Sequence, residues 1–341
     1  MPTEKNINFF GNPIMTKKYH IYIFTIAIVL LCSFPGFGSV LSENICTPDD
    51  STQRTIIFIS DTQTPMWFEK IFVKTHRNNE ATDILLDAIA SDTLVSSVYL
   101  LGDVTAMSSF NSNWVKIDTF IARLNMTDVD VHATPGNHDY LLSSSTGEKH
   151  FKQRFPDFNR TGSVIMEGPV AVILLNSNFI ELKASEEKRQ LDWYTQQLDI
   201  LEKDTTIKMV IVGCHHSPYT NSVIVNPSKK VREQFVKPFM GSSKSRLFIS
   251  GHAHTFQYFK DTLVDKHFLV IGGGGGLLHS LSSEKENDLQ DQIKWDGKYR
   301  MFHFARCTIM PDGFDLKVLM LTDDLKKLEC VYNIFIPFDK Q

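Results

Sequence analysis

The stretch Thr55-Ile-Ile-Phe-Ile-Ser60-Asp61-Thr62-Gln63 sets the pattern on which the chain is built. Its apolar and β-branched residues are typical of a strand buried on both faces, and the strand runs directly into a carboxylate. Oxygen or imidazole donors follow further strand patterns at Gly102-Asp103, Gly136-Asn137-His138-Asp139, His215-His216-Ser217-Pro218 and Gly251-His252-Ala253-His254. Because loops at the carboxyl ends of strands in open α/β sheets converge on one crevice, we expect these donors to share a site.

The residues between these blocks alternate between helix and strand patterns. Apolar residues at helical spacing predict helices over 81–90, 114–124, 186–202 and 229–239. Apolar runs predict strands over 95–101, 129–134, 170–176, 207–214, 246–250, 268–271, 301–309, 314–321 and 330–336. This order predicts an α/β fold of two packed mixed β-sheets flanked by helices, a four-layer α/β/β/α sandwich in one domain over residues 53–341.

The N-terminal residues 1–38 read as a secretory signal peptide. The Lys17–Lys18 pair precedes an apolar run over 21–34, and small residues at Gly36 and Gly38 favour cleavage near Ser39. Met15 is a second candidate start. The run is shorter than the roughly 20 apolar residues that a membrane span needs. We therefore expect a secreted or periplasmic protein with no transmembrane span after cleavage, with an uncleaved N-terminal anchor as the alternative, and a polar linker over 39–52.

Composition and charge exclude some partners. The net charge is −4 and no basic stripe is present, so we expect no nucleic-acid platform. A mildly acidic protein can still bind phosphate esters, because bound metal ions supply positive charge locally.

The sequence has no C-x-x-C pair, which argues against a cysteine zinc site. A disulfide between Cys307 and Cys330 is conceivable if the protein is exported. The sequence does not determine the oligomeric state.

The donor types themselves indicate a two-metal centre. Asp103 is the natural candidate for a carboxylate that bridges two divalent ions. Two ions about 3.5–4 Å apart can activate a shared water and neutralise charge on a phosphoryl group. Imidazole ligands favour Mn, Fe, Zn or Ni over Mg or Ca. The predicted partner is therefore a phosphate ester, and the predicted cofactors are two divalent metal ions.

These ordered blocks resemble the calcineurin-like metallophosphoesterase superfamily, whose pattern is D-x-H, G-D-x-x-D, G-N-H-D/E, a later His and G-H-x-H. The resemblance spans roughly Ile56 to Phe256, and the strands after it are similar to the purple-acid-phosphatase-like branch. It implies one metal ion bound by Asp61, Gln63, Asp103 and His254, and a second bound by Asp103, Asn137, His216 and His252. His216 is preferred over His215 because the family's ligand commonly heads an H-x-P triplet, here His216-Ser217-Pro218.

The resemblance also implies a reaction. A hydroxide held between the two ions would hydrolyse a phosphomonoester or phosphodiester. His138 would protonate the leaving group or stabilise charge on the phosphoryl oxygens. Asp139 would orient His138, although a salt-bridging or loop-capping role is equally consistent with its position. Two departures stand out: Gln63 replaces the usual His of the first block, which weakens that site, and Ala106 replaces the final Asp of the second.

Two other functions remain open at this level. A degenerate site on the same fold would make a binding protein, and Gln63 is the feature that favours it. A different substrate, such as a cyclic nucleotide or a lipid-headgroup diester, would use the same metal core with other pocket loops. The glycine run 272–276 lacks the Lys-Ser/Thr of a phosphate-binding loop, so we expect it to approach the metal cleft closely instead. His279, just past that run, is a weaker candidate for substrate contact.

Overall fold

The computed structural model describes residues 53–66, 69, 75–282 and 287–338. The signal peptide and linker predicted over residues 1–52 lie outside these ranges. Within the described part of the chain, no helix is long and apolar enough to span a lipid bilayer.

The first sheet joins strands from both ends of the domain, in the order β12-β11-β10-β1-β2-β3. Three parallel strands, β1, β2 and β3, form one side, and β1 also pairs with β10 in antiparallel register, Phe58 opposite Ala305. The strands are β1 (Arg54–Ile59), β2 (Val95–Leu100), β3 (Asp130–Ala133), β10 (His303–Met310), β11 (Gly313–Leu321) and β12 (Leu328–Pro337).

The second sheet has the order β4-β5-β6-β7-β9-β8. Its central strands β5, β6, β7 and β9 are parallel, and the edge strands β4 and β8 are antiparallel to their neighbours. The strands are β4 (Ser163–Glu167), β5 (Val170–Leu175), β6 (Met209–Cys214), β7 (Ser245–Ser250), β8 (Phe256–Asp261) and β9 (Lys266–Ile271).

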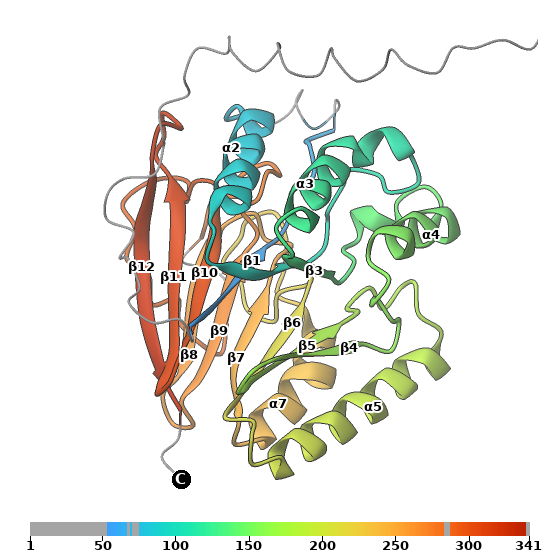
Figure 1. The fold of residues 1–341 in the computed structure, drawn as a ribbon, viewed down its shortest axis with the longest axis vertical. Coiled ribbons are helices and arrows are strands. Elements are labelled where there is room, and N and C mark those ends of the chain that lie inside the picture. Colours follow the sequence, from blue (N-terminus) through green and yellow to red (C-terminus); the bar gives the residue numbers. More distant parts are fainter. Residues whose placement is uncertain (1–52, 67–68, 70–74, 283–286, 339–341) are drawn as a thin grey trace, which may run out of the picture. The chain divides into compact units, whose positions relative to one another are not determined.

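Helices cover the outer faces of the two sheets (Figure 1). Helices α2 (Asn78–Ser91) and α3 (Val115–Asn125) lie on the first sheet, and α5 (Ala184–Lys203) and α7 (Lys237–Gly241) lie on the second, while α4 (Ser144–Arg154) follows the loop after β3. Residues 170, 172 and 174 of β5 pack in the core shared by both sheets. Residues 171, 173 and 175 pack with Tyr194 of α5 and Phe239 of α7. The strand is therefore buried on both faces, which explains its uninterrupted apolar sequence. The predicted four-layer sandwich is confirmed.

Three elements were not predicted from the sequence. Helix α4 buries Phe151 as its only large apolar side chain, which leaves almost no helical periodicity to detect. Strands β4 and β8 are edge strands next to tight turns. The helix predicted over 229–239 is broken into α6 (Lys229–Val231), a π-helical turn (Arg232–Val236) and α7. Pro238 lies in this segment, and a proline cannot donate the backbone hydrogen bond that a regular α-helix requires.

The suggested Cys307–Cys330 disulfide is wrong. Cys307 lies on β10 and Cys330 on β12, and both are free thiols. Strand β11 separates the two strands, so the backbones are roughly 10 Å apart at the usual strand spacing, beyond the reach of a disulfide.

Candidate metal centre

The five donor blocks converge at the carboxyl ends of strands from both sheets. Asp61, Asp103 and Asn137 follow β1, β2 and β3 of the first sheet, while the paired histidines 215–216 and 252–254 follow β6 and β7 of the second. In the described part of the chain, two groups of side chains have ligand atoms within 4.8 Å of one another. They are Asp61, Asp103 and His254, and His215, His216 and His252.

The first group contains a buried oxygen that is suited to a cation. Asp61 is fully buried, and its Oδ1 accepts no hydrogen bond from the described residues, although it lies 3.2 Å from Nε2 of His254. Its other oxygen, Oδ2, accepts from the backbone N–H of His252 at 2.9 Å. A buried carboxylate oxygen without a donor is costly unless a positive charge satisfies it, so this donor set fits a divalent metal ion.

Gln63, which the resemblance assigns to the first metal ion, lies next to the first group. The amide orientation that satisfies both ends has Nε2 donating to the backbone carbonyls of Asp61 at 3.0 Å and Asp103 at 2.9 Å. The side-chain oxygen then lies 3.3 Å from Nε2 of His254. The amide is thus held by two backbone groups with its carbonyl oxygen close to Nε2 of His254, where it would offer a cation a neutral ligand in place of an imidazole.

The second group adds a residue that the sequence interpretation set aside. Nε2 of His215 lies 3.4 Å from Oδ2 of Asp103 and 3.2 Å from Oδ1 of Asn137. Its Nδ1 is 2.9 Å from the backbone carbonyl of Leu101, a contact that fixes the ring and is common for metal-binding histidines. His215 is therefore the histidine of the pair that connects Asp103 with Asn137.

His216, the histidine favoured by the H-x-P spacing, lies on the outer side of the same group. Its Nδ1 is 2.8 Å from Oγ of Ser177, and its ring centroid is 4.5 Å from that of His252. It remains within ligand distance of the group, but no described contact joins it to Asp103. The two histidines differ in the direction in which their side chains leave the end of β6. Sequence spacing does not reveal this direction.

Burial and charge set the protonation of these groups in the absence of metal. Burial would raise the pKa of Asp103, but His215 and His138 outweigh it and hold that pKa well below its usual range. Burial alone would lower the pKa of His215, yet Asp103 and Asp61 raise it to about 9. Burial and the neighbouring histidines lower the pKa of His216 to about 3 and that of His252 well below its usual value. Neutral imidazoles are the form that binds metal.

The backbone at the candidate ligands is strained. Asp61, Asp103 and His252 have φ values of 60°, 49° and 64° in the left-handed region, which residues other than glycine rarely adopt. Each such residue costs about 1–3 kcal/mol, and such residues cluster at functional sites. Glycine is required close by, because a Cβ at Gly136 would lie 2.2 Å from Oδ1 of Asp103 and one at Gly251 would lie 1.9 Å from Oγ of Ser60.

His138 lies at the edge of this centre. Its backbone N–H donates to Oδ1 of Asp103 at 2.7 Å, and its Nδ1 is 3.1 Å from the carbonyl oxygen of Ala106. Its Nε2 lies 4.0 Å from Oδ2 of Asp103. Nε2 is therefore the ring nitrogen that faces the candidate ligand Asp103, and the contact with Ala106 fixes the ring.

The contacts of Asp139 match a loop-capping role. Its carboxylate accepts from the backbone N–H of Gly136 and from Oγ of Ser108, both at 2.8 Å, and at 3.4–3.5 Å from the N–H groups of Val104 and Thr105. None of its described hydrogen bonds goes to the ring of His138. Asp139 therefore connects the loop after β2 with the loop after β3.

The predicted position of the glycine run is confirmed. Backbone N–H groups of Gly274 and Gly276 donate to the carbonyls of Ser60 at 2.9 Å and Asp61 at 3.0 Å, so the run lies directly against the loop that carries the candidate ligand Asp61. His279 stacks on His254 with ring centroids 4.4 Å apart, and its Nδ1 accepts from the N–H of His254 at 3.2 Å. His279 supports a candidate ligand from behind.

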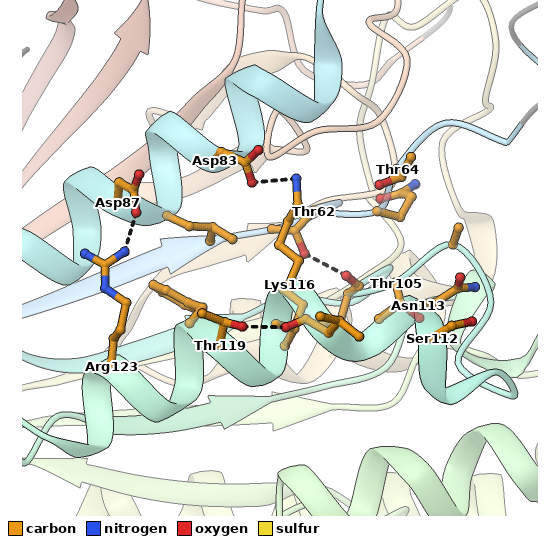
Figure 2. A pocket seen from close by; sticks show the side chains of 17 residues that line it. Thr62, Thr64, Asp83, Asp87, Thr105, Ser112, Asn113, Lys116, Thr119 and Arg123 are labelled. Carbon is orange, nitrogen blue, oxygen red and sulfur yellow. Dashed lines mark hydrogen bonds and ion pairs between the residues drawn. The ribbon is translucent and has the colours of Figure 1, made fainter. Parts of the chain in front are cut away.

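A cavity of about 560 Å³ lies between α2 and α3, next to Gln63 (Figure 2). Two ion pairs cross it, Lys116–Asp83 at 2.7 Å and Arg123–Asp87. Because these cations already have acidic partners, the cavity presents no unpaired positive charge to a phosphate.

A sandwich of two mixed sheets, with carboxylate and imidazole donors at strand ends of both sheets, defines the class of metal-dependent phosphoesterase folds. The sequence model of one family in that class, the calcineurin-like phosphoesterases, matches residues 54–256. The chain belongs to that family.

Two solved structures share this fold. GAP50, "the anchor in the inner membrane complex of Plasmodium", aligns with a TM-score of 0.61 at 13% identity, over 85% of this chain and 90% of that one. A dimetal phosphatase from Danio rerio aligns with a TM-score of 0.55 at 15% identity, over 84% of this chain and 99% of that one. Identities this low establish the fold alone. Among curated proteins, none matches the chain in sequence.

Proposed function

We propose that this protein is a metal-dependent phosphoesterase that hydrolyses a phosphomonoester or phosphodiester. The observation that carries the proposal is the buried Asp61 Oδ1, which lacks a hydrogen-bond donor among the described residues and faces His254. Asp103 also contacts His215 of the second group, which supports a role for Asp103 at both groups.

The residues have separate roles in this proposal. Two divalent ions, when bound, would supply Lewis acidity and lower the pKa of a water. Asp61, Gln63, Asp103 and His254 would hold one ion, and Asp103, Asn137, His252 and one or both of His215 and His216 would hold the other. His138 would give its Nε2 proton to the leaving oxygen as the bond to phosphorus breaks. Asp139 would keep the loops of Asp103 and His138 in register.

The test is hydrolysis of a chromogenic phosphate monoester and its diester analogue with added Mn²⁺, with and without chelator. Asp103→Asn should remove most activity because Asp103 contacts both groups. Leu263→Gln, at an exposed position in the turn after β8, is the matched control and should leave turnover unchanged. Near-normal turnover in Asp103→Asn would contradict the proposed mechanism.

His138 and the metal ligands should give different signatures. His138→Ala should lower kcat by about 10²–10⁴-fold while retaining metal, since its ring is fixed by Ala106 and its Nε2 is 4.0 Å from Asp103. His252→Ala should lose metal content together with activity. Metal analysis of both variants separates the roles, and wholesale metal loss in His138→Ala would contradict its assignment as an acid.

A binding protein on the same fold is the second candidate. Gln63 favours it, because a neutral amide is a weaker ligand than the usual histidine. The structural similarity to GAP50, whose description is that of an anchor, shows that this fold also occurs in a protein described in those terms. Metal titration calorimetry discriminates the two: a protein that binds less than one equivalent of Mn²⁺ or Zn²⁺ and hydrolyses no ester would support the binding role.

We also propose that the protein is exported. The Lys17–Lys18 pair and the apolar run over 21–34 support this proposal. N-terminal sequencing of the mature protein tests it. A new terminus near Ser39 is the expected result, and an intact N-terminus in a membrane fraction would indicate an anchor instead.

A further inference from the structure

A mainly apolar cavity of about 480 Å³ is formed by loops that also carry candidate site residues. Its described lining comes from residues 64–66, 106–107 and 141–142, with Asn113. Only Thr64 and Asn113 are polar among these, and none carries a charge. The volume lies within the range of about 300–1,000 Å³ that small-molecule sites occupy.

The three loops that line this cavity also carry candidate site residues. Residues 64–66 directly follow Gln63, residues 106–107 lie three and four positions after Asp103, and residues 141–142 lie three and four positions after His138. Ala106, which lines the cavity, also contacts the ring of His138, so the cavity adjoins the candidate acid through this residue.

Hydrogen bonds fix these walls and connect them to the candidate acid. The Ala106 carbonyl oxygen lies 3.1 Å from Nδ1 of His138. The Asn113 side chain donates to the Met107 carbonyl at 3.0 Å, and Oγ of Ser109 donates to the Leu141 carbonyl at 3.2 Å. The cavity wall and the ring of His138 are thus held in one arrangement.

We propose that this cavity binds the leaving alcohol of the substrate, and that the alcohol is apolar and uncharged. The inference rests on the proposed phosphoesterase function and names its substrate class. In the reaction, water oxygen bonds to phosphorus, the bond from phosphorus to the ester oxygen breaks, and that oxygen receives a proton from His138. The products are an alcohol and a phosphate, and the proton lost by water returns His138 to its starting form.

The chemistry of the lining selects the class of alcohol. A charged or sugar-like alcohol would lose water on entering the cavity and would find no charged partner among the described lining residues. An alkyl or aryl group loses little and gains from contact with Met107 and Leu141. Burying one methylene group favours the transition state by about fourfold in kcat/KM.

A series of n-alkyl phosphates tests this inference, because ethyl, butyl and hexyl phosphate have leaving alcohols of similar reactivity. With the Mn²⁺-loaded protein, phosphate release should rise by about fourfold in kcat/KM per methylene group. Leu141→Gln should flatten this dependence on chain length, since Leu141 is 37% exposed and can be replaced without disturbing the core. Leu263→Gln should keep the full dependence. A flat series in the unmodified protein would overturn the inference and leave the phosphoesterase function standing.

A second readout needs neither metal nor turnover. Saturation-transfer NMR should detect 1-naphthol bound to the protein in EDTA, and Leu141→Gln should lose the signal. If no ester is hydrolysed, the proposed function fails. This measurement then still tests whether the cavity binds an apolar alcohol. A signal that the variant loses supports an apolar alcohol site, and no signal in the unmodified protein overturns it.

Discussion

Replacing Asp139 with alanine should destabilise the fold, because its carboxylate connects the loop after β2 with the loop after β3. Two of its hydrogen bonds, from Gly136 N–H and Ser108 Oγ, are 2.8 Å long. Hydrogen bonds to a charged acceptor contribute about 1.5–3 kcal/mol each, or about 3–6 kcal/mol for two. Burial and the nearby Asp103 raise the pKa of Asp139 to about 6, so the ionised form is disfavoured in the fold and offsets part of this gain. We expect a net loss of about 2–3 kcal/mol at pH 7.

Urea unfolding followed by circular dichroism measures this loss directly, in the presence of chelator so that metal content does not contribute. His138→Ala is the matched control and should remain within about 1 kcal/mol of the unmodified protein, because its backbone contact with Asp103 is retained. If Asp139 instead acts only by orienting His138, Asp139→Ala would lower turnover as His138→Ala does and unfold at the same urea concentration as the unmodified protein. That result would refute the loop-capping assignment.

Three further changes test other parts of the structure. Gln63→His should tighten Zn²⁺ or Mn²⁺ binding at the first group by on the order of tenfold in calorimetric titration, because imidazole is the stronger ligand; unchanged affinity would contradict its placement there. Gly273→Ala places a Cβ 2.1 Å from Cε1 of His303 and should cost about 2 kcal/mol in thermal unfolding, whereas Gly241→Ala meets nothing within 4 Å and should cost little. Burial lowers the pKa of His267 in the folded protein to about 4, below its unfolded value of roughly 6.5. The contribution of His267 to the free energy of unfolding is therefore full above pH 6.5 and is lost as the pH falls towards 4. The loss reaches up to about 1.4 kcal/mol per pH unit. His267→Gln should flatten that slope, and an unchanged slope would assign the acid sensitivity to other groups.

The positions of the donor blocks were predictable because each follows a strand with a clear apolar pattern. Asp61 and Asp103 follow strands buried on both faces, so the end of each strand is marked by the first charged residue. The choice between His215 and His216 was not predictable in the same way. Both follow β6 directly, and only the path of the chain after Cys214 decides which ring meets Asp103.

Elements that bury few apolar side chains of their own could also not be predicted from the sequence. Helix α4 buries few apolar side chains and packs closely against its neighbours. A Cβ added at Gly147 in this helix would lie only 2.2 Å from the carbonyl oxygen of Asp139. The role of Asp139 could not be chosen from the motif either. Its partners Ser108 and Val104 belong to a different loop, and a hydrogen bond between distant segments leaves no local pattern.

The candidate ligands are divided between two sheets, and this division has a consequence for how the candidate site can be inherited. Asp61, Asp103 and Asn137 follow strands β1–β3, and the histidines of the two groups follow strands β6 and β7, so neither half of the chain contains the complete set of candidate ligands. A gene fragment that encodes one half would lack the contact between Asp103 and His215 that joins the two groups. Loops outside the centre, by contrast, can change length and sequence while the ligands stay in place. Within such a lineage, specificity can diversify in small steps, but the ligand set is kept or lost as a whole.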